Sequence, residues 1–264
     1  MIKCELCKLS KSWKAKIIIF IGVVLSMFHT WDSIFYTGAS ERKMNQYHPA
    51  FASFLNGISA NGSYRTYFLW IMPMFLIMAY SGMYVSEKRK NIDVILYTRM
   101  NKKEFFFSKI KTAAIFAVIL NLIPNIISIV MTSIFLHGKK GFMDAESWSR
   151  SDYGDFPYWC VHNPYLTYVI YLLSNLIVMA LLSIVCQSIV FVVEDAKLAT
   201  LIAIAIWLGI YMGNDLFYIG YILQPFIDEN TLETIVMSWA TYIPMVILWV
   251  TAAYFKVVKK SDKL

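Results

Sequence analysis

The chain has 264 residues, of which 58% are hydrophobic and only 16% are charged, and its mean hydropathy is +0.56. A water-soluble domain of this length carries about 25% charged residues, so this composition excludes a single soluble core and predicts a membrane protein. The net charge of +7 does not indicate nucleic-acid binding, because the basic residues cluster beside apolar runs instead of covering one face of a soluble domain.

The first fifteen residues are expected to form an amphipathic helix on the membrane surface. Ile2, Leu6, Leu9 and Trp13 recur at spacings of 4, 3 and 4, which is one stripe of a helix, and lysines occupy the other faces. A basic helix with an apolar stripe and a tryptophan is typical of the lipid interface. The alternative is a charged tail without regular structure.

Six apolar segments are long enough to cross a bilayer as helices, the form in which a chain satisfies its own backbone hydrogen bonds in lipid. They cover residues 17–36, 67–85, 112–136, 165–193, 198–214 and 237–255. With the N-terminus in the cytoplasm, 18 of the 24 basic residues fall on the inner side, so both termini are predicted to be cytoplasmic. The fold class is therefore an all-α polytopic membrane protein, with one transmembrane domain over residues 1–264.

Several polar residues lie in or beside these spans. They are Asp32, Asn121, Asn125, Asn175 and Asp215. Ionisable and amide side chains within a membrane are candidates for a translocation pathway, although they also form hydrogen bonds between helices. Both acids map near the outer ends of their spans, where anchoring is the simpler role. Aromatic residues in the outer loop 137–164 are expected to anchor that loop at the headgroup level, with substrate contact as the alternative.

No catalytic or metal-binding motif is present in the sequence. Cys4 and Cys7 form a C-x-x-C, but no second pair or histidine cluster completes a zinc site, so we interpret them as reduced thiols, with a redox pair as the alternative. The sequence has no phosphate-binding loop, no H-E-x-x-H and no G-x-S-x-G. The chain is therefore predicted to be neither an enzyme nor an ATP-binding subunit, and to hold no metal or cofactor.

The segment between the second and third spans combines basic residues with an apolar centre. Ile92, Ile95 and Leu96 fall at helical spacing, and a break at 98–101 follows. Asn101 is a plausible N-cap of the next helix, with Glu104 completing a capping box. We predict a helix, a tight turn and a second helix on the cytoplasmic face, whose apolar patch needs lipid or a protein partner to cover it.

This segment resembles that of the permeases of type-2 ATP-binding-cassette (ABC) exporters. The matching features are AYSGMYVSEKRK, then IDVILY, then Thr98-Arg99, Lys102-Lys103, Phe105 and Lys109. Six spans, an interfacial N-terminal helix and the length of the chain are also similar to that family. One departure is that a glycine often found shortly after the acidic residue is replaced by the basic run and Asn91.

The resemblance implies which residues contact a separate ATPase subunit. Residues 86–104 would form the coupling segment, with a smaller contact at the second inner loop, for which a solvated turn is the alternative. The residues so assigned are Glu87, Arg89, Ile92, Ile95, Leu96, Arg99, Glu194 and Asp195. The resemblance also implies short re-entrant helices within 215–234 on the outer side, where an ordinary interfacial loop is the alternative.

The resemblance further implies an ATP-driven exporter of the cell membrane. Two permeases, identical or paralogous, would assemble in membrane lipid with two ATPase subunits, which hold ATP and magnesium. An amphipathic peptide or a hydrophobic small molecule is the expected cargo, as in antimicrobial-peptide or drug export and immunity. One alternative is a secondary transporter coupled to ions or protons, which would need acids near the membrane midplane. The other is a membrane sensor or immunity protein without transport.

Overall fold

The structure is a computed structural model that describes residues 2–35, 47–57, 64–92, 101–142, 154–212, 218–227 and 231–259. Within these ranges the chain is almost entirely helical and contains no β-strand; Tyr47 and Gly141 form an isolated β-bridge. The all-α prediction is therefore confirmed for the described part of the chain.

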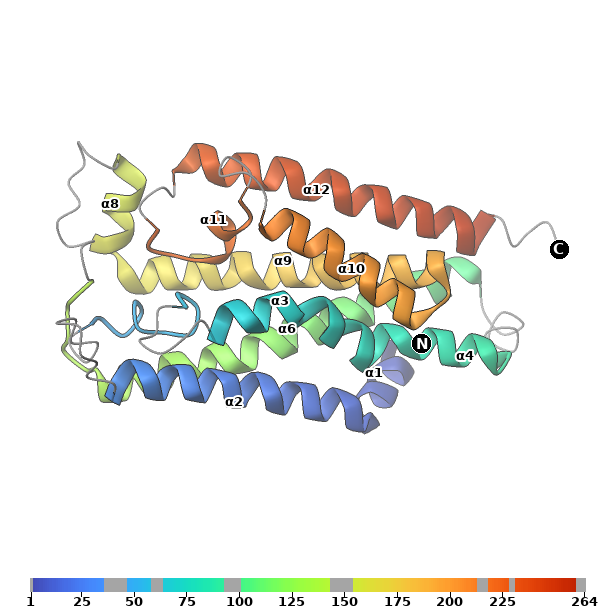
Figure 1. Cartoon of the computed structure of the whole chain (residues 1–264), viewed down its shortest axis with the longest axis horizontal. Helices are drawn as coiled ribbons and strands as arrows, with labels where there is room; N and C mark the ends of the chain where they lie inside the picture. Colours follow the sequence, from blue (N-terminus) through green and yellow to red (C-terminus); the bar gives the residue numbers. More distant parts are fainter. Residues whose placement is uncertain are drawn as a thin grey trace.

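Long helices run roughly parallel to one another along the long axis of the molecule (Figure 1). They are α2 (Trp13–Phe35), α3 (Tyr64–Leu76) with its continuation η2 (Ile77–Ser81) and α4 (Gly82–Arg89), α6 (Lys102–Phe135), α9 (Pro164–Val193), α10 (Ala196–Tyr211) and α12 (Leu232–Tyr254) with η5 (Phe255–Lys259). Successive helices alternate in direction. Helix α9 contacts α3, α6, α10 and α12, so the core of the bundle forms around it.

Five helices in the described residues are long and apolar enough to cross a membrane, as in a multi-pass membrane protein. They begin at Trp13, Tyr64, Lys102, Pro164 and Leu232. The predicted span 198–214 corresponds to α10, which has 16 residues and ends at Tyr211. At 1.5 Å per residue this helix is about 24 Å long, short of the roughly 30 Å hydrocarbon core. It ends just before the Gly213-Asn214 pair, two residues that commonly terminate helices.

The second long helix is continuous from Tyr64 to Arg89 but contains Pro73 and the π-helical turn η2. Proline has no N–H, so the carbonyl of Leu69, four residues earlier, loses its helical partner. The indole N–H of Trp207 in α10 donates to that carbonyl at 2.8 Å, and Trp207 is fully buried. A side chain from a neighbouring helix thus satisfies the backbone group that the proline leaves free.

Three shorter helices lie at the two ends of the bundle: α1 (Ile2–Lys11), α8 (Asp155–His162) and α11 (Gly220–Leu223). Figure 1 shows α1 at the end where α12 finishes, and α8 at the opposite end. Helix α1 packs against α6 and α2 and buries Leu9 and Glu5, while Trp13 at the start of α2 is 72% exposed. Part of the predicted apolar stripe therefore faces protein; placement of α1 at a lipid interface stays a prediction.

Residues 47–57 form a segment that sequence reasoning missed. All but Gly57 are buried, and Tyr47, Phe51 and Leu55 belong to an apolar cluster that also includes residues of α9. The backbone N–H of Phe54 donates to the hydroxyl of Ser128 in α6 at 2.9 Å. The segment is too short to appear as a span, and its burial depends on polar partners from distant helices.

Candidate functional site

Several charged residues meet at the end of the bundle where α1, α4 and η5 lie together with the start of α6 and the 194–197 connection (Figure 1). We call this the charged end. It includes the described residues of the predicted coupling segment, which are 86–92 and 101–104. It also contains the 194–197 connection, which the sequence predicts as a smaller contact to the same partner.

Of the break predicted at 98–101, the structure describes only Asn101. An earlier turn follows α4, at a place where sequence reasoning put no break. Helix α4 ends at Arg89, and Asn91 adopts the left-handed conformation with φ of 54°. Asparagine tolerates this region better than other non-glycine residues do. Asn101 is the N-cap of α6, and its side chain accepts from the backbone N–H of Lys103 at 3.0 Å. Ile95, Leu96 and Arg99 lie outside the described residues.

A buried network of two acids and two lysines joins α1, α4 and α6. Lys109 of α6 lies 2.8 Å from an oxygen of Glu5 and 2.6 Å from an oxygen of Glu87. Lys8 lies 2.9 Å from the second oxygen of Glu5 and 3.0 Å from that of Glu87. The hydroxyl of Tyr80 also donates to Glu5 at 3.1 Å. Glu87, predicted as a contact to the ATPase, is thus held by groups of its own chain.

The two acids and two lysines of the network carry equal and opposite charges. Glu5 and Lys109 are each only 1% exposed. Burial opposes the ionisation of Glu5, but the charges and hydrogen bonds of Lys109 and Lys8 outweigh it and hold the pKa of Glu5 below its ordinary value. Burial likewise opposes the charge of Lys8, and its two acidic partners raise the pKa of that ammonium. Each charge therefore depends on the others, which links the three helices at this point.

A second set of ion pairs joins α4 to the 194–197 connection and to η5. Lys88 lies 2.5 Å and Lys256 lies 2.9 Å from Glu194, and Arg89 lies 3.7 Å from Asp195. Partial burial disfavours the charged form of Glu194, but its hydrogen bonds with the two lysines lower the pKa overall. The predicted residues Arg89, Glu194 and Asp195 are brought together here.

The connection itself is a tight turn between α9 and α10. Glu194 ends α9 in the left-handed conformation with φ of 62°, and Asp195 is the N-cap of α10, accepting from the backbone N–H groups of Lys197 and Leu198 at 2.9 Å. These backbone bonds are the main reason why the pKa of Asp195 is lowered. The turn is therefore held by its own caps as well as by α4.

The candidate pathway residues lie away from this end. The amide of Asn121 donates to that of Asn175 across α6 and α9, and Asn175 donates in turn to the carbonyl of Leu223 at 3.2 Å. Asn125 donates to the carbonyl of Asn121 at 2.8 Å. The first two bonds connect neighbouring helices and the third lies within α6, and a role in a pathway stays a prediction. Asp32 is buried near the end of α2, and Asp215 lies outside the described residues.

Arg65 is a site residue that sequence reasoning did not select. It is 3% exposed, and its guanidinium donates to the carbonyl of Phe54 at 3.0 Å and to that of Leu223 at 2.7 Å. It thereby connects the buried segments 47–57 and 218–227 at the opposite end from the charged network. Its position at the start of a span resembled a simple flanking charge, so the sequence offered no signal for burial. The expected re-entrant character of 215–234 stays a prediction, but α11 within it is buried.

No group of three histidine, cysteine, aspartate or glutamate residues in the described ranges is arranged to hold a metal ion. Cys4 and Cys7 are exposed free thiols on α1. The chain is 21% identical over 183 residues to a protein of Bacillus subtilis (strain 168) named "Uncharacterized protein YybM", an alignment that covers 69% of this chain and 72% of that protein. No family model matches the chain, and no solved structure matches it.

Proposed function

We propose that this chain is the membrane-spanning permease subunit of an ATP-driven exporter of the ABC type in the cell membrane. In this proposal the charged end is cytoplasmic and binds a separate ATPase subunit. The chain itself holds no nucleotide and catalyses no reaction. Two ATPase subunits would bind ATP and magnesium, and a second permease, identical or paralogous, would complete the transporter.

The observation that most directly supports the proposal is the position of the two connections assigned to the ATPase contact. The 90–101 and 194–197 connections are far apart in the sequence, yet Lys88 and Arg89 pair with Glu194 and Asp195. One partner subunit can therefore contact both connections on one surface.

The buried network provides a physical route for force from that surface into the bundle. Glu87, two residues before the end of α4, is held by Lys109 of α6 and Lys8 of α1. A displacement of the coupling segment would move α4, and the ion pairs would carry the displacement to α1 and α6. Rigid helices joined by buried contacts transmit such shifts between discrete arrangements.

The expected cargo is an amphipathic peptide or a hydrophobic small molecule. The buried side chains of the described bundle are mostly aliphatic and aromatic, and the buried amides of Asn121, Asn125 and Asn175 are the polar candidates. Asp32 and Asp215 remain the residues to test for ion coupling if the chain works without an ATPase.

The proposal is tested by isolating the tagged protein from its native membranes in mild detergent and identifying co-purifying proteins by mass spectrometry. We expect an ATPase with a phosphate-binding loop in stoichiometric amount. Replacing Ile92, Ile95 and Leu96 by aspartate should abolish this association. Leu232→Asp, an exposed apolar position at the opposite end of the bundle, is the control and should retain the ATPase. Repeated isolation without an ATPase would show that the proposal is wrong.

A further inference from the structure

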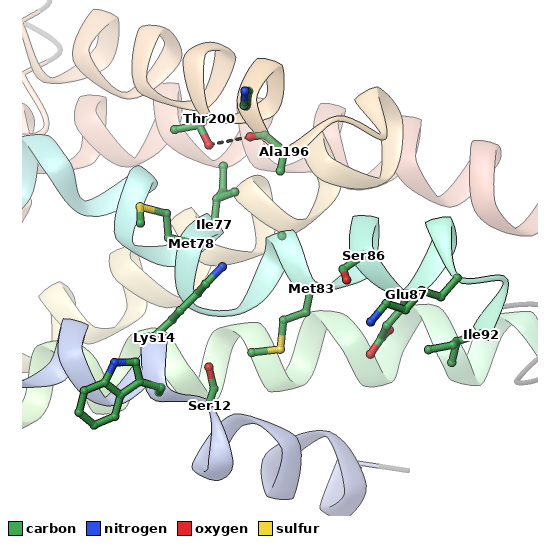
Figure 2. A pocket seen from close by; sticks show the side chains of 14 residues that line it. Ser12, Lys14, Ile77, Met78, Met83, Ser86, Glu87, Ile92, Ala196 and Thr200 are labelled. Atoms are coloured by element: carbon green, nitrogen blue, oxygen red, sulfur yellow. Dashed lines mark hydrogen bonds between the residues drawn. The ribbon is translucent and has the colours of Figure 1, made fainter.

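A groove of about 690 Å³ opens at the charged end, between the junction of α1 with α2, the η2–α4 segment and the start of α10. Figure 2 shows Lys14 of α2 extending toward Ile77 and Met78, with Met83 and Glu87 farther along α4 and Ala196 and Thr200 on the facing helix. Glu87 and Ile92, which belong to the proposed ATPase contact, also line the groove.

The floor and walls of the groove are mostly apolar. Trp13, Ile77, Met78, Met83 and Ala196 line it. Gly82 also lines the groove, directly after the π-helical turn, and a Cβ added there would come within 2.9 Å of the carbonyl oxygen of Ile77 in the same helix. This lining suits hydrocarbon and is unsuited to a small hydrated ion.

The rim of the groove is basic. Lys14, Lys90 and Lys197 line it, and within the described ranges none of these ammonium groups forms an ion pair. The carboxylate of Glu87 is engaged by Lys8 and Lys109. An occupant that neutralises the rim must therefore bring negative charge of its own.

The groove lies at the depth of lipid headgroups if the long helices span a membrane. The exposed indole of Trp13 marks the start of α2, and tryptophan concentrates at the membrane interface. Ile17 on α2 and Leu201 on α10 are close in sequence to residues that line the groove, and both are exposed, as lipid-facing side chains are. A soluble partner would have to cover this apolar surface as well as the lysines. A lipid matches both, because its headgroup suits the lysines and its acyl chain suits the apolar surface.

We propose that the groove binds one anionic membrane lipid, with its phosphate among Lys14, Lys90 and Lys197 and an acyl chain along Ile77, Met78 and Met83. Basic pockets between transmembrane helices bind anionic headgroups by this combination of charge and apolar contact. The proposal rests on the groove alone and does not require that the chain be a permease.

The test uses the full-length protein in nanodiscs that contain phosphatidylglycerol and phosphatidylcholine in equal amounts. Native mass spectrometry after release from the disc counts the lipids that stay bound. We expect one phosphatidylglycerol molecule retained in preference to phosphatidylcholine. The triple variant Lys14→Gln, Lys90→Gln, Lys197→Gln should reduce this preference at least about tenfold, since each lysine near an anionic headgroup changes affinity by about fivefold.

Two further variants distinguish a lipid site in the groove from a general effect of positive charge and from a contact between protein chains. Lys11→Gln, Lys16→Gln, Lys111→Gln removes the same charge from exposed lysines outside the groove and should keep the preference. Ala196→Phe fills the apolar wall and should reduce retention although all lysines remain. Equal retention in both triple variants would overturn the proposal. The proposal would also be overturned if Ala196→Phe lost a dimer but kept the lipid, since the groove would then contact a second copy. Binding of inorganic phosphate as tight as that of the lipid would overturn it as well.

Discussion

Lys109 and Glu5 lie 104 residues apart in the sequence, yet their side chains meet at 2.8 Å in the interior of the protein. Both are almost completely buried, and each would be a strongly unfavourable charge without the other. Because Lys109 also holds Glu87, this contact joins the N-terminal helix to α4, whose last residues belong to the proposed coupling segment.

Lys109→Met is expected to destabilise the protein by about 3 kcal/mol, because it leaves the buried carboxylate of Glu5 and the partly buried one of Glu87 with only Lys8 as a partner. The melting temperature in detergent measures this effect. Lys111→Met, two residues further along α6 and exposed, is the matched control and should melt close to the wild type. Equal melting of the two variants would contradict a structural role for the network.

The network also predicts a pH dependence. The pKa of Glu5 is lowered in the folded state, so its contribution to stability is complete above its ordinary value of 4.5 and is lost as the pH falls through the lowered pKa. Melting temperatures should therefore drop below about pH 4.5, and Glu5→Gln should reduce the slope in that window. An unchanged slope in Glu5→Gln would mean that other carboxylates cause the acid sensitivity.

Arg65 is expected to hold the segments 47–57 and 218–227 in place together. Arg65→Met leaves the carbonyls of Phe54 and Leu223 without this donor, so both segments should exchange their amide hydrogens faster. Hydrogen–deuterium exchange with mass spectrometry measures both at once. Lys140→Met, an exposed residue at the same end, is the control. Faster exchange in only one segment would argue against a shared connection.

Trp207→Phe should cost about 1 to 3 kcal/mol, since the Leu69 carbonyl left free by Pro73 would then be buried without a donor. Trp70→Phe is a close control, because the buried indole N–H of Trp70 makes no hydrogen bond in the described structure. The comparison of the two melting temperatures isolates the hydrogen bond from the loss of ring volume. A loss of stability no larger for Trp207→Phe than for Trp70→Phe would show that the hydrogen bond contributes little.

The sequence alone determined the helical class, the approximate bounds of the long helices and the start of α6 at its N-cap Asn101. These features depend on local composition: apolar runs of sufficient length, and a capping residue such as Asn101. The one span that differs, α10, is shorter because a helix-terminating pair follows it, a signal that was present but outweighed by the apolar run.

The tertiary structure decided which polar residues are buried and what they meet. Lys109 and Arg65 each looked like a charge flanking a span, and 47–57 looked like an outer loop. Their burial depends on partners supplied by helices far away in the chain, such as Glu5 for Lys109 and the Leu223 carbonyl for Arg65. A buried charge is stable only beside such partners, and no local sequence pattern indicates which distant group will supply them.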